Sequence, residues 1–478
     1  MTIPAAVTDI ITRLSKAGFE AYIVGGCVRD ALRGVEPNDW DVTTNARPDD
    51  IMNAIPEGKY ENVYGTVIVP IRDADENLLD VIEVTTYRSE RGYSDHRHPD
   101  EVKFEDRLEE DLSRRDFSIN ALAMSLDGTV IDLFNGQKDI SKKVIRTVGE
   151  PEDRFKEDGL RMLRAVRLAC QLGFSIEGKT ERSIMKLAGI IKFIANERIR
   201  DELIKILSSD RPAEGIGKLQ ELKLLNYIIP ELEEGLGMQQ NHHHTREVFD
   251  HNLLSLKHCP NPAWQVRLAA LMHDIGKPRT KKIINGAATF YNHEMVGAKM
   301  VERIMKRLKF SADDSRRVVN LVRNHMFYYN VEEVTAASVR RLIVKVGREN
   351  LSDLIDLRVA DRLGSGVAKA MPYKLRHLQY MMEKVQADPV SVKMLKINGD
   401  VLMKALGMKP GPKIGAILDV LLSEVIEDPE RNTEAYLESR SRELDTLEIE
   451  DLRERAKTVI QEKRQEEDKQ LKKNFYVS

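Results

Sequence analysis

Two carboxylates one residue apart, Asp39 and Asp41, are the first side chains in this sequence whose type and spacing suit catalysis. Side chains alternate between two sides of an extended segment, so both carboxylates face one way and Trp40 faces the other. Paired carboxylates on one face suit Mg²⁺, which prefers oxygen ligands and keeps positions open for water and substrate phosphates. The pair therefore predicts metal-assisted chemistry on a phosphate compound.

A glycine pair precedes these carboxylates and supplies the complementary half of such a site. The apolar run at 21–24 is typical of a short strand. Gly25 and Gly26 then form a turn at which the backbone can approach a bound group closely. Backbone N–H groups of this turn, together with the fixed cation of Arg29, can hold a triphosphate.

A third carboxylate could complete the metal site. Apolar runs at 65–71 and 78–88 predict two strands, and Glu83 lies in the second of them. We expect Glu83 to join Asp39 and Asp41; the alternative is an ordinary glutamate on the solvent side of a strand. The polar stretch 89–110 that follows predicts a mobile loop.

Polar side chains are dense between residues 111 and 120, just before an apolar stretch. Asn120 comes four residues after Asp116 and is expected to share its helical face, with Arg114 and Arg115 one turn earlier. This pattern predicts the wall of a pocket, and the alternative is a capped helix with solvated arginines. The sequence leaves open which of the two arginines faces the ligand.

Residues 152–174 have the apolar periodicity of one helix, on which Asp158, Arg161 and Arg164 share a face. Asp158 can accept a hydrogen bond from an amino group, and Arg161 can donate one to a ring nitrogen. Cytosine and adenine present that pattern, whereas uracil and guanine reverse it. A site of this kind rejects a wrong base because its buried polar groups are left unpaired. The alternative is an exposed ion pair without a role in binding.

The composition limits the class of protein. The length of 478 residues allows two to four domains. The net charge is only −3, so any surface for nucleic acid must be a local patch. Cys27, Cys170 and Cys259 are far apart in the sequence, which fits a reducing compartment. We find no signal peptide and no apolar run near the roughly 20 residues of a membrane helix, so we expect a cytoplasmic protein that makes no membrane contact.

Three motifs in order, GGCVRDALRG…NDWDVTT, RRDF…NA and EDGLR, make the chain resemble bacterial-type (class II) CCA tRNA nucleotidyltransferases and poly(A) polymerases. The resemblance implies that Asp39 and Asp41 hold Mg²⁺ and that Asp158 and Arg161 select the incoming base. It also implies nucleotide contacts from the RRDF motif. The full predicted nucleotide site is Gly25, Gly26, Arg29, Arg115, Asp116, Asn120, Asp158, Arg161 and Arg164.

A second constellation lies farther along the chain, where eight of the eleven histidines fall between residues 242 and 325. The dipeptide His273-Asp274 follows an apolar run and is costly to bury unless it is paired or metal-bound. With the flanking residues, the sequence HDIGKP resembles the HD metal-dependent phosphohydrolases. The resemblance implies four ligands, His251, His273, Asp274 and Asp361, and two positions for a second metal, His293 and His325. Such ligands suit Mn²⁺, Ni²⁺, Zn²⁺ or iron. For any single histidine, the alternative is a hydrogen-bonded core residue.

We therefore predict an α+β protein in which a mixed sheet with helices is followed by a helical neck, body and tail. The expected domains are a nucleotidyltransferase head at 1–149, a neck with the base-selecting helix at 150–240, an HD-type metal-binding domain at 241–370 and a tRNA-binding tail at 371–478. The tail has helical periodicity and carries turn-forming Gly and Pro next to lysines.

The predicted function is template-independent addition or repair of the 3′-terminal CCA of tRNA, with CTP, ATP and the tRNA acceptor end as substrates. The resemblance to HD phosphohydrolases also leaves open an accessory phosphohydrolase activity of the HD region. One alternative is a sibling activity, an A-adding enzyme or a poly(A) polymerase. A second is an HD phosphohydrolase whose head only binds RNA, and a third is a non-catalytic RNA-binding module.

Overall fold

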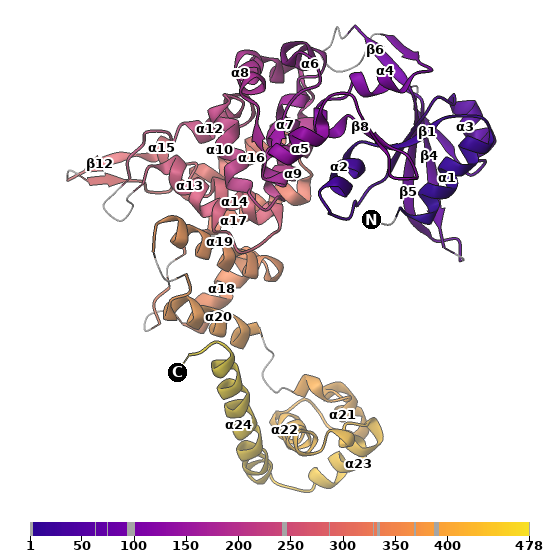
Figure 1. Ribbon diagram of the computed structural model, residues 1–478. Coiled ribbons are helices and arrows are strands. Elements are labelled where there is room, and N and C mark those ends of the chain that lie inside the picture. Colours follow the sequence, from indigo (N-terminus) through magenta and orange to yellow (C-terminus); the bar gives the residue numbers. More distant parts are fainter. Residues whose placement is uncertain are drawn as a thin grey trace. The chain divides into compact units, whose positions relative to one another are not determined.

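The computed structural model describes residues 3–62, 64–73, 75–92, 101–240, 246–285, 287–327, 329–331, 335–367, 370–386 and 392–477. The chain divides into two compact units (Figure 1). The first comprises Met1–His325 with Asp356–Ala368, and the second comprises Met326–Ile355 with Lys369–Ser478. Both candidate sites lie in the first unit. The division into four domains stays a prediction.

A seven-stranded mixed sheet forms the N-terminal part of the first unit, with the order β3-β4-β5-β2-β1-β8-β9. Its strands are β1 (Ala21–Val24), β2 (Asp41–Thr44), β3 (Lys59–Asn62), β4 (Thr66–Arg72), β5 (Leu78–Thr86), β8 (Leu122–Met124) and β9 (Val130–Asp132). Central strand β2 is antiparallel to β1 and parallel to β5. In this register Asp41 lies between Val24 and Glu83.

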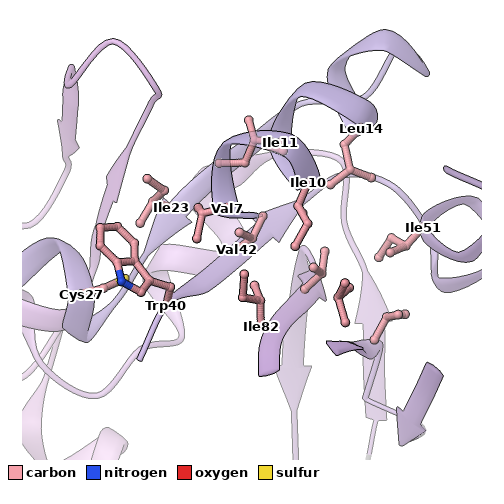
Figure 2. Close-up of a cluster of buried hydrophobic side chains, with 14 of the residues drawn as sticks. Val7, Ile10, Ile11, Leu14, Ile23, Cys27, Trp40, Val42, Ile51 and Ile82 are labelled. Atoms are coloured by element: carbon pink, nitrogen blue, oxygen red, sulfur yellow. The ribbon is translucent and has the colours of Figure 1, made fainter. Parts of the chain in front are cut away.

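One face of the sheet is covered by α1 (Ala5–Lys16) and α3 (Pro48–Ala54). Apolar residues of α1 recur at helical spacing, and Val7, Ile10 and Leu14 are buried in the main core of this part (Figure 2). Val42 and Trp40 belong to the same core. Because Trp40 and Val42 point into this core, alternation sends Asp39 and Asp41 to the opposite side, as the sequence predicts.

The opposite face of the sheet is covered by α4 (Leu108–Ser113). Leu108 and Leu112 of this helix pack with the fully buried Tyr87 and with Val24 in a smaller core. Thr43, two residues after Asp41, contacts the buried carboxylate of Asp111 in α4 at 3.4 Å. The acidic site is therefore flanked by the helix that immediately precedes the RRDF segment.

The rest of the first unit is mostly helical (Figure 1). Its helices are α2 (Gly26–Leu32), α5 (Gly136–Lys142), α6 (Pro151–Glu157), α7 (Leu160–Leu172), α8 (Gly178–Leu187), α9 (Asn196–Leu207), α10 (Pro212–Glu221), α11 (Leu225–Ile228), α12 (Pro230–Glu233), α13 (Val248–Lys257), α14 (Trp264–Met272), α15 (Lys277–Thr280), α16 (His293–Arg307), α17 (Ala312–Asn324) and most of α19 (Leu351–Gly364), with 3₁₀ turns η1 (Ser118–Asn120) and η2 (Ala188–Phe193).

The second unit is helical throughout its described residues. It contains α18 (Ala336–Val346), η3 (Arg348–Asn350), α20 (Tyr373–Gln386), η4 (Val392–Met394), α21 (Gly399–Leu406), α22 (Pro412–Glu427), η5 (Pro429–Arg431), α23 (Glu434–Leu444) and α24 (Ile449–Asn474). Its core is built around Ile417, Leu421 and Leu437. Leu452 and Ala456 join this core near the start of α24, so this first part of the charged C-terminal helix packs against α22.

The predicted α+β class is confirmed, and short strands interrupt the helical part in two places. One is the pair β10 (Val144–Ile145) and β11 (Ser175–Ile176), and the other is the hairpin of β12 (Lys282–Ile284) and β13 (Ala287–Thr289). The expected loop at 89–110 is partly a two-stranded ribbon of β6 (Arg88–Arg91) and β7 (Glu101–Phe104); residues 93–100 lie outside the described part. Among the described residues, we find no helix with the length and apolar character to span a bilayer.

Candidate active site

Three carboxylates converge at the centre of the sheet. Asp41 and Glu83 are in-register neighbours on parallel strands, and paired strands lie about 4.8 Å apart, so both side chains point to the same face. Asp39 precedes β2 and is exposed, while Asp41 is half-buried. The pKa of Asp41 is raised, mainly by burial; Arg115 opposes this shift, and the charge of Asp39 adds to it. Burial, followed by the nearby charges of Asp41, Glu61 and Asp39, raises the pKa of Glu83.

Such mutual repulsion among carboxylates is relieved by a divalent cation. The donor set of Asp39, Asp41 and Glu83 consists of oxygen atoms only, which fits a hard ion such as Mg²⁺. The structure thus places Glu83 beside Asp41, where the sequence suggested it.

Gly25 is the position at which backbone, cation and carboxylate meet. It has φ +89° and ψ −137°, a conformation that glycine adopts far more readily than other residues. A Cβ built there would lie 3.1 Å from Nη1 of Arg115 and 3.6 Å from Oδ2 of Asp41. Gly26 begins α2, and Arg29 folds back so that its guanidinium lies close to Gly26. The glycine pair therefore leaves room for charged groups against the main chain.

The structure distinguishes the two arginines of the RRDF segment. Both pair with the buried Asp111, through Nη2 of Arg114 at 2.6 Å and Nη2 of Arg115 at 3.2 Å. Only Arg115 of this pair also approaches Gly25 and Asp41. Arg115 is thus the arginine that faces the acidic site. Asp111 was not singled out from the sequence, although its position three and four residues before the arginines was a usable signal.

A chain of hydrogen bonds connects α2 with α7. Arg29 Nη1 donates to Asn120 Oδ1 at 2.8 Å, and Asn120 Nδ2 donates to Asp116 Oδ1 at 3.1 Å. Arg164 Nε then donates to Asp116 Oδ2 at 2.7 Å. Burial would raise the pKa of Asp116, but Arg164 and the hydrogen bond from Asn120 lower it to about 2. Four predicted nucleotide-site residues therefore form one ionised network.

The expectation that Asp116 and Asn120 share one helical face is wrong. Helix α4 ends at Ser113, Asp116 lies in an irregular segment, and Asn120 closes the short 3₁₀ turn η1. Asp116 also accepts the backbone N–H of Phe117, so its side chain stabilises the turn itself. The two residues are close because the chain turns between them, and the hydrogen bond from Asn120 to Asp116 stabilises this turn.

The expectation of one continuous helix over 152–174 is also wrong. Helix α6 ends at Glu157, α7 begins at Leu160, and Asp158 between them is extended, with φ −138° and ψ 106°. Asp158 accepts the N–H of Leu160 at 3.0 Å, so its carboxylate contacts the first residue of the second helix and does not project from a continuous one. Helical periodicity did not reveal the break because Gly159, which forms the joint, is tolerated inside apolar helical patterns.

The two residues expected to select the base have separate partners. Asp158 pairs with Arg198 of α9, with 2.8 Å between Oδ2 and Nη2. Arg161 is buried and pairs with Glu157, with 2.6 Å between Nη1 and Oε2. Arg161 Nη2 also donates to the carbonyl of Arg114 at 3.2 Å, which connects α7 to the RRDF segment.

The six predicted HD residues form one cluster, in which all but the half-buried Asp361 are buried. They come from five helices or helix ends: His251 from α13, His273 and Asp274 from the end of α14, His293 from the start of α16, His325 from the end of α17 and Asp361 from α19. Asp274 Oδ2 lies 3.2 Å from Nε2 of His251 and 3.3 Å from Nε2 of His273, and Asp274 Oδ1 lies 3.1 Å from Nε2 of His293.

The possible ligand atoms are arranged for two cations, with Asp274 as a ligand of both. His251, His273 and Asp274 form one group of possible ligands, and Asp274, His293 and His325 form the other. Asp361 Oδ1 lies 3.3 Å from Nε2 of His251, beside the first group. These side chains are suited to a metal because their ligand atoms meet in a buried space that holds both carboxylate and imidazole groups.

Hydrogen bonds orient three of these imidazoles for metal binding. Nδ1 of His273, His293 and His325 lies 2.7–2.8 Å from the backbone carbonyls of Ala270, Phe290 and Val322, respectively. An Nδ1–H that donates to a carbonyl leaves the Nε2 lone pair free for a metal.

A lysine outside the predicted ligand set completes this cluster. The Lys277 ammonium is buried, lies 2.6 Å from Asp274 Oδ2 and donates to Gln240 Oε1. Burial would raise the pKa of Asp274, but His273 and Lys277 hold that pKa well below its usual range. The spacing of Lys277, three residues after Asp274, was the available signal.

Three family models match successive parts of the chain between residues 21 and 365. Family models match "Poly A polymerase head domain" at residues 21–146, "Probable RNA and SrmB- binding site of polymerase A" at 173–236 and "HD domain" at 242–365. An A-adding tRNA nucleotidyltransferase of Deinococcus radiodurans is 35% identical over 84% of this chain and 90% of its own length. A CCA-adding enzyme of Lactiplantibacillus plantarum is 33% identical over 88% and 91%.

The fold is similar to that of a solved relative. The structure of the Bacillus stearothermophilus CCA-adding enzyme in complex with CTP aligns with a TM-score of 0.60 at 27% identity, covering 93% of this chain and all of that one.

Proposed function

Because the chain belongs to the bacterial tRNA nucleotidyltransferases, the family that includes the CCA-adding enzymes, we propose that it completes the 3′-CCA end of tRNA from CTP and ATP in the cytoplasm. The observation that carries the proposal is the placement of Asp41 beside Glu83 and beside Arg115 at the Gly25 turn, with Asp39 near enough for its charge to act on both carboxylates. A carboxylate cluster and a cation are needed side by side when a triphosphate is brought to a metal site.

Nucleotidyltransferase and HD regions both imply dependence on divalent metals. In the head we assign Mg²⁺ to Asp39, Asp41 and Glu83, where bound ions would acidify the 3′-hydroxyl of tRNA and neutralise the departing pyrophosphate. Arg115, which already lies against Gly25, and Arg29 bind the triphosphate oxygens. Asn120, which Asp116 and Arg164 hold in place, orients Arg29 together with the adjacent Asp30.

We assign base selection to Asp158 and Arg161. The carboxylate accepts from the amino group of cytosine or adenine, and the guanidinium donates to the neighbouring ring nitrogen. UTP and GTP present carbonyl and N–H groups in the reverse order, which leaves buried charges unpaired. The broken helix supports this assignment, because Asp158 lies at the joint, where Arg198 and the N–H of Leu160 hold its carboxylate, and does not lie in a helical row.

The test uses the whole chain, Mg²⁺ and two tRNAs, one that ends at its discriminator base and one that already ends in CC, with CTP, ATP or both. We expect addition that stops at CCA when 3′ ends are read at single-nucleotide resolution. Addition only to tRNA already ending in CC would identify an A-adding enzyme, and long A-tails would identify a poly(A) polymerase. Either result would refute the proposal.

A second function is favoured by the buried cluster of five possible metal ligands, with Asp361 beside it. We propose that it holds Mn²⁺, Ni²⁺, Zn²⁺ or iron and hydrolyses a phosphoester, with Asp274 shared between two ions. Hydrolysis of a 2′,3′-cyclic nucleotide, lost in Asp274→Asn and kept in Asp39→Asn, would support this. Hydrolysis lost in Asp39→Asn but kept in Asp274→Asn, or absent with each of the four metals, would refute it.

A further inference from the structure

The guanidinium of Arg115 lies between two carboxylates, those of Asp111 and Asp41, and is paired with the first. We propose that Asp111 is a positioning residue for the metal site: it holds Arg115 away from Asp41 and so keeps the Asp41 carboxylate available to Mg²⁺. The inference rests on the proposed Mg²⁺ site of the head. It gives a role in metal binding to a buried side chain that is not itself a ligand.

Arg115 and Asp41 are close enough for the arginine to compete with a metal ion. Nη1 of Arg115 and Oδ2 of Asp41 lie 3.1 and 3.6 Å from one point, the position of a Cβ on Gly25. Even so, among the described residues we find an ion pair of Arg115 with Asp111, at 3.2 Å, and none with Asp41. A guanidinium paired with Asp41 would occupy the oxygen atoms that Mg²⁺ needs, because both cations bind the same lone pairs.

Asp111 is the stronger anchor for Arg115 because its carboxylate is fully buried and ionised. Nε and Nη2 of Arg114 donate to Oδ1 at 3.0 and 2.6 Å, and Nη2 of Arg115 donates to Oδ2 at 3.2 Å. Burial would raise the pKa of Asp111, but the two arginines hold that pKa below its ordinary value. If Arg115 moved to the half-buried Asp41, a buried charge would lose one of its two cations, which is costly.

Asp111 is also tied to the strand that carries the metal ligand. Thr43 Oγ1 lies 3.4 Å from Asp111 Oδ2, and the same hydroxyl donates to the carbonyl of Thr85 at 3.2 Å. Thr43 follows Asp41 by two residues in β2, so the two side chains point to the same face, roughly 7 Å apart along the strand. Asp111 therefore lies on the same face of the sheet as the metal ligand, where one guanidinium can reach toward both carboxylates.

This arrangement lets Arg115 and Asp41 act on different groups. Nη2 of Arg115 is bonded to Asp111, whereas we find no hydrogen-bond partner for Nη1 among the described residues. Nη1 faces Gly25, where we place the triphosphate, so it is available to a phosphate oxygen while Asp41 holds the ion. A magnesium-bound triphosphate needs both at once, a carboxylate for the ion and a cation for the phosphate.

The competing explanation is that Asp111 only balances the charges of Arg114 and Arg115 and stabilises α4. With such a structural role, loss of Asp111 distorts the site whether or not the Arg115 guanidinium is present. In the proposed role, the loss of metal affinity depends on Arg115 itself, because without its guanidinium nothing competes for Asp41. The two explanations therefore differ in a double variant.

The test measures Mn²⁺ binding to the nucleotide-free protein through the EPR signal of free Mn²⁺, an ion that suits carboxylate ligands as Mg²⁺ does. All variants carry Asp274→Ala, which removes the ligand shared within the HD cluster. We expect Asp111→Asn to weaken binding at the head site roughly tenfold, because the freed arginine gains a charge-assisted hydrogen bond to Asp41. Adding Arg115→Gln should restore the affinity. Glu109→Gln, which removes an exposed charge from the same helix, is the control and should leave it unchanged.

Thermal melting verifies that each variant folds. Unchanged Mn²⁺ affinity in folded Asp111→Asn refutes the inference, and so does a loss that Arg115→Gln does not restore. If Asp111→Asn does not fold, Asp111→Glu replaces it, because the added methylene keeps the charge but displaces it from its partners. The same two results refute the inference in that variant.

Asp41→Asn separates failure of this inference from failure of the proposed metal site. If Asp41→Asn binds Mn²⁺ as tightly as its parent, the assignment of the ion to Asp41 and this inference both fail. If Asp41→Asn loses Mn²⁺ while Asp111→Asn keeps it, only the role of Asp111 is refuted.

Discussion

The Asp116 network makes a prediction about how stability depends on pH. The pKa of Asp116 is about 2 in the folded protein against an ordinary value of 3.8, and the residue is buried. A pKa difference of about 1.8, at 1.36 kcal/mol for each pH unit, corresponds to about 2.4 kcal/mol of stability when the group is ionised. Because the folded-state pKa is the lower one, this stability is present above pH 4–5 and is lost as the pH falls toward 2.

Asp116→Asn removes the titrating group and keeps its size. We expect the variant to lose about 2 kcal/mol of unfolding free energy at pH 7 and only about half of that at pH 3. Urea unfolding followed by Trp40 fluorescence reports on the sheet region that contains the network, in a Trp264→Phe background that removes the other tryptophan. Asp201→Asn, at an exposed ion pair, is the control and should cost less than about 0.5 kcal/mol. A loss in Asp116→Asn that is the same at pH 7 and pH 3 would refute the electrostatic account.

Three further predictions concern the two sites. Gly25→Ala should lower kcat/KM for nucleotide addition at least roughly tenfold, because its Cβ would crowd Arg115. Gly18→Ala is the control, because at φ +91° it carries a similar backbone strain of about 1–3 kcal/mol but its Cβ would have no atom within 4 Å. An equal loss of kcat/KM in both variants would contradict the role of Gly25. Asp41→Asn should abolish incorporation from CTP and ATP while His273→Ala retains it, as read on sequencing gels; loss in both would mean that the sites depend on each other. Asp274→Ala should remove metal retained after dialysis against Mn²⁺ or Ni²⁺, measured by elemental analysis, because Asp274 is shared by both ligand groups; an unchanged metal content would exclude that arrangement.

Motifs that depend on short spacings were predictable from the sequence. Asp39 and Asp41 had to share a face because strand residues alternate, and the buried Trp40 between them indicates which side is the core. The HD residues were found through their motif, although 110 residues separate His251 from Asp361. By contrast, the helix over 152–174 and the shared helical face of Asp116 and Asn120 were predicted incorrectly. Periodicity describes an average over several turns and does not register a two-residue break or a tight turn.

The sequence by itself determined the chemical types at both sites: carboxylates beside a glycine turn, an aspartate and an arginine three residues apart, and histidines with aspartates in apolar surroundings. Only the tertiary structure decided which of these groups meet. It placed Glu83 beside Asp41 through a parallel strand pair, chose Arg115 over Arg114, and paired Asp158 with Arg198 and Arg161 with Glu157. The physical reason is that local spacing fixes direction along one element, whereas the partner of a buried charge depends on how separate elements pack.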